Sequence, residues 1–156
     1  MSEKFVFDEK DFEFMSWRGV RVHAIAFSPE DHELALDVDY ITKSLEPAEA
    51  QNHFTYMVAP ASMYFENASG IEFDLKIDNT YALAIAGIEQ TYIRRTPNDK
   101  YEVWRYEIGF RHVGGIILEA SGFKLFLRHN PMHSETEYLS PKRRGGISFS
   151  RVRTAP

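Results

Sequence analysis

Hydrophobic and polar residues alternate along much of the chain with a period of two, the spacing of side chains on the two faces of a β-strand. In residues 33–41 one face carries Leu34, Leu36, Val38 and Tyr40, and the other carries Glu33, Ala35, Asp37 and Asp39. Residues 20–27 alternate too, with Val20, Val22, Ala24 and Ala26 opposite Arg21, His23, Ile25 and Phe27. Turn-forming residues 28–32 separate the two segments, so we expect a β-hairpin with one buried face.

The same reasoning predicts further short strands wherever the alternation resumes between turn residues. They are 54–59, 62–66, 71–77, 102–110, 116–120, 123–128 and 147–152. Pro60 is expected to end the first of these, because proline has no N–H to donate to a sheet. Ser121 and Gly122 are expected to join 116–120 and 123–128 as a second hairpin. Residues 81–95 mix alanines with a central glycine, and we interpret them as a strand followed by an irregular piece.

Helix is expected in at most one or two short pieces. Residues 8–14 fit a short helix capped by Asp8, and residues 44–52 fit a loop or one helical turn. The whole pattern predicts a mainly β, antiparallel fold of about eight to ten short strands. A two-sheet sandwich or roll and a small barrel both agree with it. A length of 156 residues favours a single domain over 1–156, with loose ends near 1–7 and 152–156.

Composition narrows the class of protein. The chain contains no cysteine, which excludes disulfides, thiol catalysis and cysteine-ligated metals and fits a reducing compartment. We see no signal peptide, and the longest nearly uncharged apolar run, 81–88, is too short to cross a membrane. We therefore expect a soluble, cytoplasmic protein. A net charge of −5 argues against nucleic-acid binding, which usually needs a basic excess.

Two charged features are candidates for binding. Glu33, Asp37 and Asp39 share one strand face, and an exposed acidic face of this kind would attract a cationic partner protein. Lys142, Arg143 and Arg144 precede two glycines and form a basic loop that would hold an anion or an acidic partner. For each feature, a solvated surface without function is the simpler interpretation. A second basic pair, Arg94-Arg95, would extend the loop into a patch if the fold brought the two together.

Motifs for catalysis and cofactor binding are missing. His129 and His133 have the spacing of helical zinc ligands, but Asn130-Pro131 between them opposes a helix. The sequence contains no Gly-x-Ser-x-Gly, no phosphate-binding glycine motif and no calcium loop. We therefore assign no catalytic residue, no metal and no cofactor, and an enzyme is the less favoured interpretation.

Two further patterns are explained without a specific function. Ala-Ser-Gly occurs at 68–70 and again at 120–122, each time before a predicted strand. Because Ser-Gly is a common turn dipeptide, chance explains this repeat more simply than duplication. Aromatic side chains are frequent, and they would either line a ligand cavity or fill the core. The residues concerned are Phe54, Tyr56, Tyr64, Phe65, Trp104, Tyr106 and Phe110.

Several segments resemble a pattern found in small uncharacterised bacterial proteins, some of which are grouped with immunity proteins. They are Leu-Asp-Val-Asp-Tyr-Ile at 36–41, Tyr-Met-Val-Ala-Pro-Ala at 56–61, Phe-Glu-Asn at 65–67, Ala-Ser-Gly-Phe at 120–123 and Arg-Gly-Gly-Ile-Ser-Phe at 144–149. The resemblance runs from Trp17 onward and implies a protein that binds and neutralises a toxin. In that pattern Trp-His-Asp is expected near the start, whereas Arg18 and Gly19 follow Trp17 here. No role of that His and Asp can be carried over.

The sequence therefore favours a small, non-enzymatic protein-interaction module, such as an immunity-type inhibitor, whose partner is another protein. Two alternatives stay open. One is a small-molecule-binding β domain with an aromatic-lined cavity. The other is a hydrolase-like enzyme that draws histidine and carboxylates from different strands.

Overall fold

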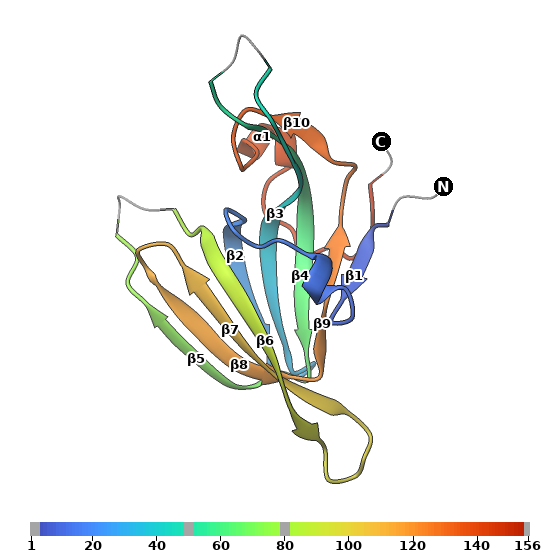
Figure 1. The fold of residues 1–156 in the computed structure, drawn as a ribbon. Coiled ribbons are helices and arrows are strands. Elements are labelled where there is room, and N and C mark those ends of the chain that lie inside the picture. The colour runs from blue at the N-terminus through green and yellow to red at the C-terminus, as the bar shows by residue number, and fades with distance from the viewer. Residues whose placement is uncertain (1–3, 49–51, 79–81, 155–156) are drawn as a thin grey trace.

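The computed structural model describes residues 4–48, 52–78 and 82–154 and shows a mainly β fold with two antiparallel sheets (Figure 1). In the larger sheet the strand order is β1-β9-β4-β3-β2, and β10 also pairs with β4. Its strands are β1 (Val6–Asp8), β2 (Arg21–Ser28), β3 (Glu33–Leu45), β4 (Thr55–Glu66), β9 (Gly122–Leu127) and β10 (Met132–Ser134). The predicted mainly β, two-sheet class is confirmed.

The smaller sheet has the order β5-β8-β7-β6. Its strands are β5 (Ser69–Leu75), β6 (Ile85–Arg95), β7 (Glu102–Phe110) and β8 (Gly114–Ala120). Two short helices complete the described structure, a 3-10 turn at Phe12–Phe14 and α1 at Pro141–Arg144. At one edge the sheets touch, because Arg21 at the start of β2 forms an isolated bridge with Ala84. Among the described residues, no helix has the length and apolarity needed to cross a membrane.

The hydrophobic core lies between the two sheets. The predicted buried face of β3 is confirmed, since Leu34, Leu36, Val38 and Tyr40 all lie in the core cluster. Phe65, Tyr106 and Phe123 meet at its centre, where the rings of Phe65 and Tyr106 are 5.0 Å apart and those of Tyr106 and Phe123 are 6.0 Å apart. These three rings come from β4, β7 and β9, so they join the two sheets.

A β-bulge at His23 changes the predicted faces of β2. Val22 pairs with Val38, whereas Ala24 pairs with Asp37, so His23 is the extra residue. A bulge of this kind reverses the alternation beyond it. As a result Ile25, opposite Leu36, packs against the core on the same side as Val22. Phe27, opposite Leu34, lies on that side too but is about half exposed. The prediction that Ala24 and Ala26 continue the face of Val20 and Val22 was therefore wrong.

Pro60 does not end a strand, because β4 runs through it as one long strand. The Pro60 carbonyl accepts a hydrogen bond from the Arg128 N–H (2.8 Å), so the proline nitrogen also faces the β9 side. There β9 ends at Leu127 and β10 begins only at Met132. No ladder hydrogen bond is required from Pro60 at this gap, which is why the proline is tolerated.

The expected hairpin of 116–120 and 123–128 was also wrong, since β8 and β9 belong to different sheets. The chain crosses between the sheets at both Ala-Ser-Gly segments, from β4 to β5 and from β8 to β9. The two crossings lie side by side: the Ser121 N–H donates to the Glu66 carbonyl (2.8 Å) and the Asn67 amide donates to the Ser121 hydroxyl (2.9 Å). The repeated tripeptide thus marks two neighbouring corners of the fold.

The remaining differences concern segment ends. Residues 8–14 form the end of β1 and a 3-10 turn instead of one helix, and Val6 and Phe7 pair with β9 instead of being loose. Strand β6 is continuous to Arg95. Residues 147–152 form no strand, although Thr154 after them donates to the Arg128 carbonyl (2.7 Å). Parts of three predicted segments lie outside the described residues, namely residues 49–51 of the expected loop, Tyr81 and residues 155–156.

Candidate functional site

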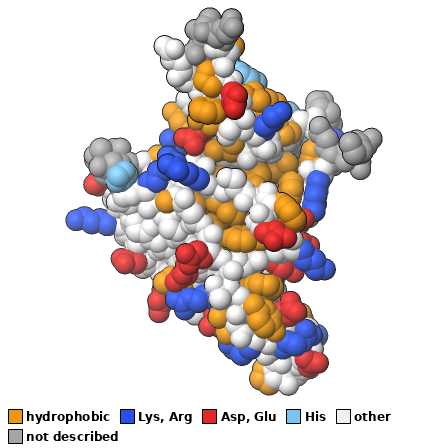
Figure 2. All heavy atoms as spheres, in the orientation of Figure 1, with side chains coloured by type: hydrophobic (Ala, Val, Ile, Leu, Met, Phe, Trp, Pro, Cys, Tyr) orange, Lys and Arg blue, Asp and Glu red, His pale blue; other side chains and the backbone are white. Residues whose placement is uncertain are grey.

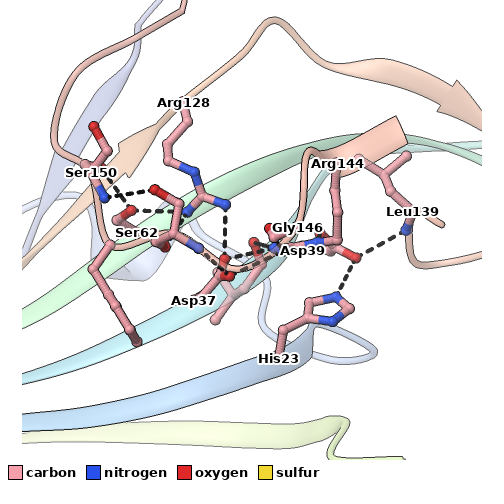
Figure 3. A network of polar contacts seen from close by, with 12 residues as sticks. His23, Asp37, Asp39, Ser62, Arg128, Leu139, Arg144, Gly146 and Ser150 are labelled. Atoms are coloured by element: carbon pink, nitrogen blue, oxygen red, sulfur yellow. Dashed lines mark hydrogen bonds and ion pairs between the residues drawn. The ribbon is translucent and has the colours of Figure 1, made fainter. Parts of the chain in front are cut away.

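The two charged features predicted from the sequence meet each other in the structure. Asp37 and Asp39 lie on the outer face of β3, where residues 139–154, here termed the C-terminal segment, cover them (Figure 3). Arg144 donates from Nε to Asp39 Oδ1 (3.0 Å) and from Nη1 and Nη2 to Asp37 (3.0 and 2.6 Å). Both aspartates are 0% exposed. The expected exposed acidic face was therefore wrong for these two residues, which are already paired with the basic loop.

The other members of the predicted features remain nearer the surface. Glu33 forms a two-pronged ion pair with Arg151 of the C-terminal segment, at 2.7 Å to each oxygen. Lys142 and Arg143 are exposed. Arg143 donates to the His133 carbonyl (2.7 Å), and no ion pair holds either cation among the described residues. Only these two of the three loop cations are available to an outside partner.

Arg128 is a central residue that sequence reasoning missed. Its guanidinium donates to Asp37 Oδ1, to the Ser62 hydroxyl and to the Ser148 carbonyl, each at 2.9 Å. Ser62 in turn donates to the Ser150 carbonyl (2.7 Å). An isolated arginine followed by His-Asn-Pro carries no recognisable motif. The sequence indicated only that Arg128 ends a strand, and the structure places it beside Pro60 in the middle of β4.

His23 also belongs to the network, through its contact with Asp39. Its Nε2 lies 2.7 Å from Asp39 Oδ2, which also accepts the Leu139 N–H (2.9 Å). The bulge turns the His23 ring toward the outer face, where Asp39 lies. This pair joins a histidine and a carboxylate from two strands, as the enzyme hypothesis expected. Within the described part of the chain, however, no serine, threonine or tyrosine hydroxyl is hydrogen-bonded to His23.

Asp39 is an ionised carboxylate in this environment. Burial by itself raises its pKa, but the hydrogen bonds from His23 and the Leu139 N–H, together with the charge of Arg144, outweigh burial and bring the pKa below its ordinary value. A carboxyl with a lowered pKa stabilises the folded state above its unfolded pKa, and that stabilisation disappears as the pH falls through the folded pKa. The network should therefore weaken only in strongly acidic solution.

Replacing Asp39 with asparagine tests this electrostatic contribution. At pH 7 we expect Asp39→Asn to reduce the free energy of unfolding by about 1–3 kcal/mol, because the variant removes the charge and replaces one of the two acceptor oxygens with an NH2 donor. The difference from the wild type should shrink below about pH 4. Urea unfolding at several pH values measures it, with exposed Asp74→Asn as the control. A difference that stays constant from pH 7 to pH 3 would contradict the assignment.

The aromatic residues proposed for a ligand cavity do not line one cavity. Phe65 and Tyr106 are fully buried in the core, and Tyr106 donates to Gln90 Oε1 (2.6 Å). Phe54 and Tyr56 line a surface cavity of about 330 Å³ elsewhere, beside Arg21. The predicted aromatic set is thus divided between the core and the surface.

The remaining histidine and arginine candidates are also separated. His129 Nδ1 contacts the neighbouring Asn130 carbonyl (2.8 Å). No group of three metal-binding side chains occurs among the described residues, so the structure does not bring His129 and His133 together with a third ligand. Arg95 pairs with Asp99 and Glu102 within the β6–β7 hairpin. Figure 1 places the tip of this hairpin at the opposite end of the molecule from α1. The patch that would have combined Arg94-Arg95 with the basic loop does not form.

Two carboxylates and two guanidiniums therefore form a buried network of balanced charge that attaches the C-terminal segment to the larger sheet. Buried ion pairs of this kind are costly to break, since each ion would be left without its partner. Comparison of the chain with family models, with curated proteins and with solved structures finds no match.

Proposed function

We propose that the protein is a non-enzymatic interaction module of the bacterial cytoplasm, and that it contacts a partner protein through the outer part of the β6–β7 hairpin. The observation that carries this proposal is a group of exposed hydrophobic side chains there. Tyr92, Ile93 and Tyr101 are 47%, 39% and 41% exposed. Figure 2 shows hydrophobic side chains among acidic and basic ones on the projecting hairpin at the bottom of the view.

The hairpin projects because its neighbour in the sheet is shorter. Strand β8 ends at Ala120 opposite Trp104, so residues 93–103 extend past the sheet as a two-stranded arm. Together with Tyr92 at their base, which pairs with Trp104, these residues are called the arm (residues 92–103). An isolated two-stranded hairpin is marginally stable in water, so the arm depends on its continuity with the sheet and on contacts of its own.

Local contacts hold the arm in shape. The rings of Tyr92 and Trp104 pack edge to face with centroids 5.3 Å apart. Arg95 bonds to Asp99 across the turn, and the Thr96 hydroxyl accepts the Tyr101 N–H (3.1 Å). A preformed arm loses little conformational entropy when it binds, and tyrosine supplies a large contact area at low entropic cost.

These properties favour a partner protein with an apolar depression bordered by charged groups. Aromatic residues are enriched in the cores of protein interfaces, and a few of them carry most of the binding energy. The immunity-type form of the proposal, with a toxin as the partner, rests on the sequence resemblance.

Quantitative affinity capture from the cells that produce the protein tests the proposal. We expect at least one protein to be retained by the wild type and to be reduced at least about tenfold with the double variant Tyr92→Ser/Ile93→Ser, because interface aromatics commonly contribute 2 kcal/mol or more.

Phe73→Ser is the matched control, since Phe73 is a similarly exposed hydrophobic residue (51%) on β5 of the same sheet. It should retain the same protein as the wild type. If every captured protein is retained equally by the wild type, the arm variant and the control, the arm is not the contact surface.

A further inference from the structure

A surface cavity of about 300 Å³ opens beside the buried network, on the side of the C-terminal segment. The charge of its lining is positive, whereas the whole chain has a net charge of −5. Five of its lining residues are basic, three carry hydroxyl groups and none is acidic. The lining consists of Pro60, Arg128, His129, Lys142, Arg143, Arg144, Gly145, Ser148, Ser150, Val152 and Thr154.

The buried network fixes the inner wall of this cavity. Arg128 and Arg144 are both 6% exposed and are held from behind by Asp37 and Asp39. The two aspartates balance the charge of the two arginines without lining the cavity. The inner wall is thus held in place before any ligand arrives, which lowers the cost of binding. Arg144 already donates its N–H groups to Asp37, Asp39 and two backbone carbonyls, so it shapes this wall without donating to the ligand.

The outer wall carries the uncompensated charge. Lys142 and Arg143 are exposed, and no ion pair holds either of them among the residues that the structure describes. Within this cavity the charges of Arg128 and Arg144 cancel against the two aspartates. The cavity therefore keeps about two positive charges for a ligand, from groups whose Coulomb attraction reaches about 10 Å in ordinary salt.

The serines add directed donors. The Ser148 hydroxyl oxygen accepts the Ser150 N–H and the Ser150 hydroxyl oxygen accepts the Val152 N–H, each at 3.1 Å. Neither hydroxyl proton has an acceptor in the described structure. Both remain free to donate into the cavity.

From this lining we infer that the cavity binds the phosphate group of a small molecule. The Lys142 ammonium, the Arg143 guanidinium and the hydroxyls of Ser148 and Ser150 line one space, and such donors match the several acceptor oxygens of a tetrahedral phosphate. The volume is at the lower end for ligand sites, about 300–1,000 Å³, which limits the organic part of the ligand. This site is independent of the arm, which lies at the other end of the molecule (Figure 1).

The test is an NMR titration of the isotopically labelled, full-length protein with inorganic phosphate at constant ionic strength. We expect saturable shifts of the backbone amides of residues 142–145, 148 and 150, with a Kd at or below about 1 mM. No saturable shift, or saturable shifts confined to other residues, would overturn the proposal. A phosphate monoester such as glycerol phosphate then separates the two sources, since tighter binding than inorganic phosphate identifies an organic phosphate as the ligand.

Two double variants with the same change in charge complete the experiment. Lys142→Gln/Arg143→Gln should weaken phosphate binding at least about tenfold, since it removes two charge-assisted contacts. Arg94→Gln/Lys100→Gln, within the arm, should leave the affinity within about twofold, because charges that far away are screened. Equal losses in both variants would show a general charge effect and would contradict a built phosphate site.

Discussion

Arg144→Ala is expected to lower the free energy of unfolding by about 3–5 kcal/mol, because removing one partner of a buried ion pair leaves the other charge without compensation. Arg144 donates to both Asp37 and Asp39, which are completely buried. Arg128 still contacts Asp37 in the variant, so Asp39 keeps only the hydrogen bonds from His23 and the Leu139 N–H. Urea unfolding followed by circular dichroism measures the loss.

Arg143→Ala is the matched control for this prediction. Arg143 is the neighbouring residue in α1 and carries the same charge, but its side chain is exposed and donates one hydrogen bond, to the His133 carbonyl. Its replacement should change stability by less than about 1 kcal/mol. If the two variants lose similar stability, the buried network does not attach the C-terminal segment as described.

Phe123→Ala is the second change with a large expected effect, a loss of about 3–5 kcal/mol, because it removes a buried ring and leaves a cavity. Phe123 is fully buried, and its ring lies 5.9–6.3 Å from those of Phe12, Trp17, Phe65 and Tyr106. Since those rings come from both sheets, the variant should also lose the near-ultraviolet circular dichroism of the aromatic cluster.

The control for the core variant is Phe73→Ala on β5. The Phe73 side chain is about half exposed, so its truncation should change stability by no more than about 0.5 kcal/mol. A small effect at Phe123, comparable with that at Phe73, would mean that the ring does not join the two sheets.

Local pattern was sufficient to predict several of the strands. The strand predicted at 102–110 is β7, with the same bounds, and its Tyr106, Ile108 and Phe110 face the core. The β2–β3 hairpin also agrees with the prediction. These elements follow from alternation and turn residues, which depend on neighbours in the sequence.

The sheet arrangement could not be read from the same pattern. After a Ser-Gly corner the chain can form the next strand in the same sheet or in another sheet. The alternation of hydrophobic and polar residues is the same in both cases. Likewise the single-residue bulge at His23 changes which residues are buried, yet nothing in the sequence marks it. Register and crossings are set by packing between distant segments, which a single sequence does not display.

The sequence indicated several residues of the candidate site but not their contacts with one another, for a related reason. Asp37, Asp39 and Arg144 were recognised as charged features, but each was interpreted as a surface group. Their pairing joins residues separated by more than a hundred positions. Alternation indicates which side of a strand a residue occupies, but it does not indicate whether a later segment covers that side.

The place of Arg144 in the chain has a consequence for biosynthesis. Arg144 follows all the strands in chain order, so during translation the ribosome delivers it only after β1 to β10 have been made. Until then the C-terminal segment cannot cover the outer face of the larger sheet, and Asp39 lacks its arginine partner. Charged residues of this kind oppose the aggregation of partly folded sheets. The carboxylates that hold the C-terminal segment in the finished protein would therefore first help to keep the growing chain from associating with its neighbours.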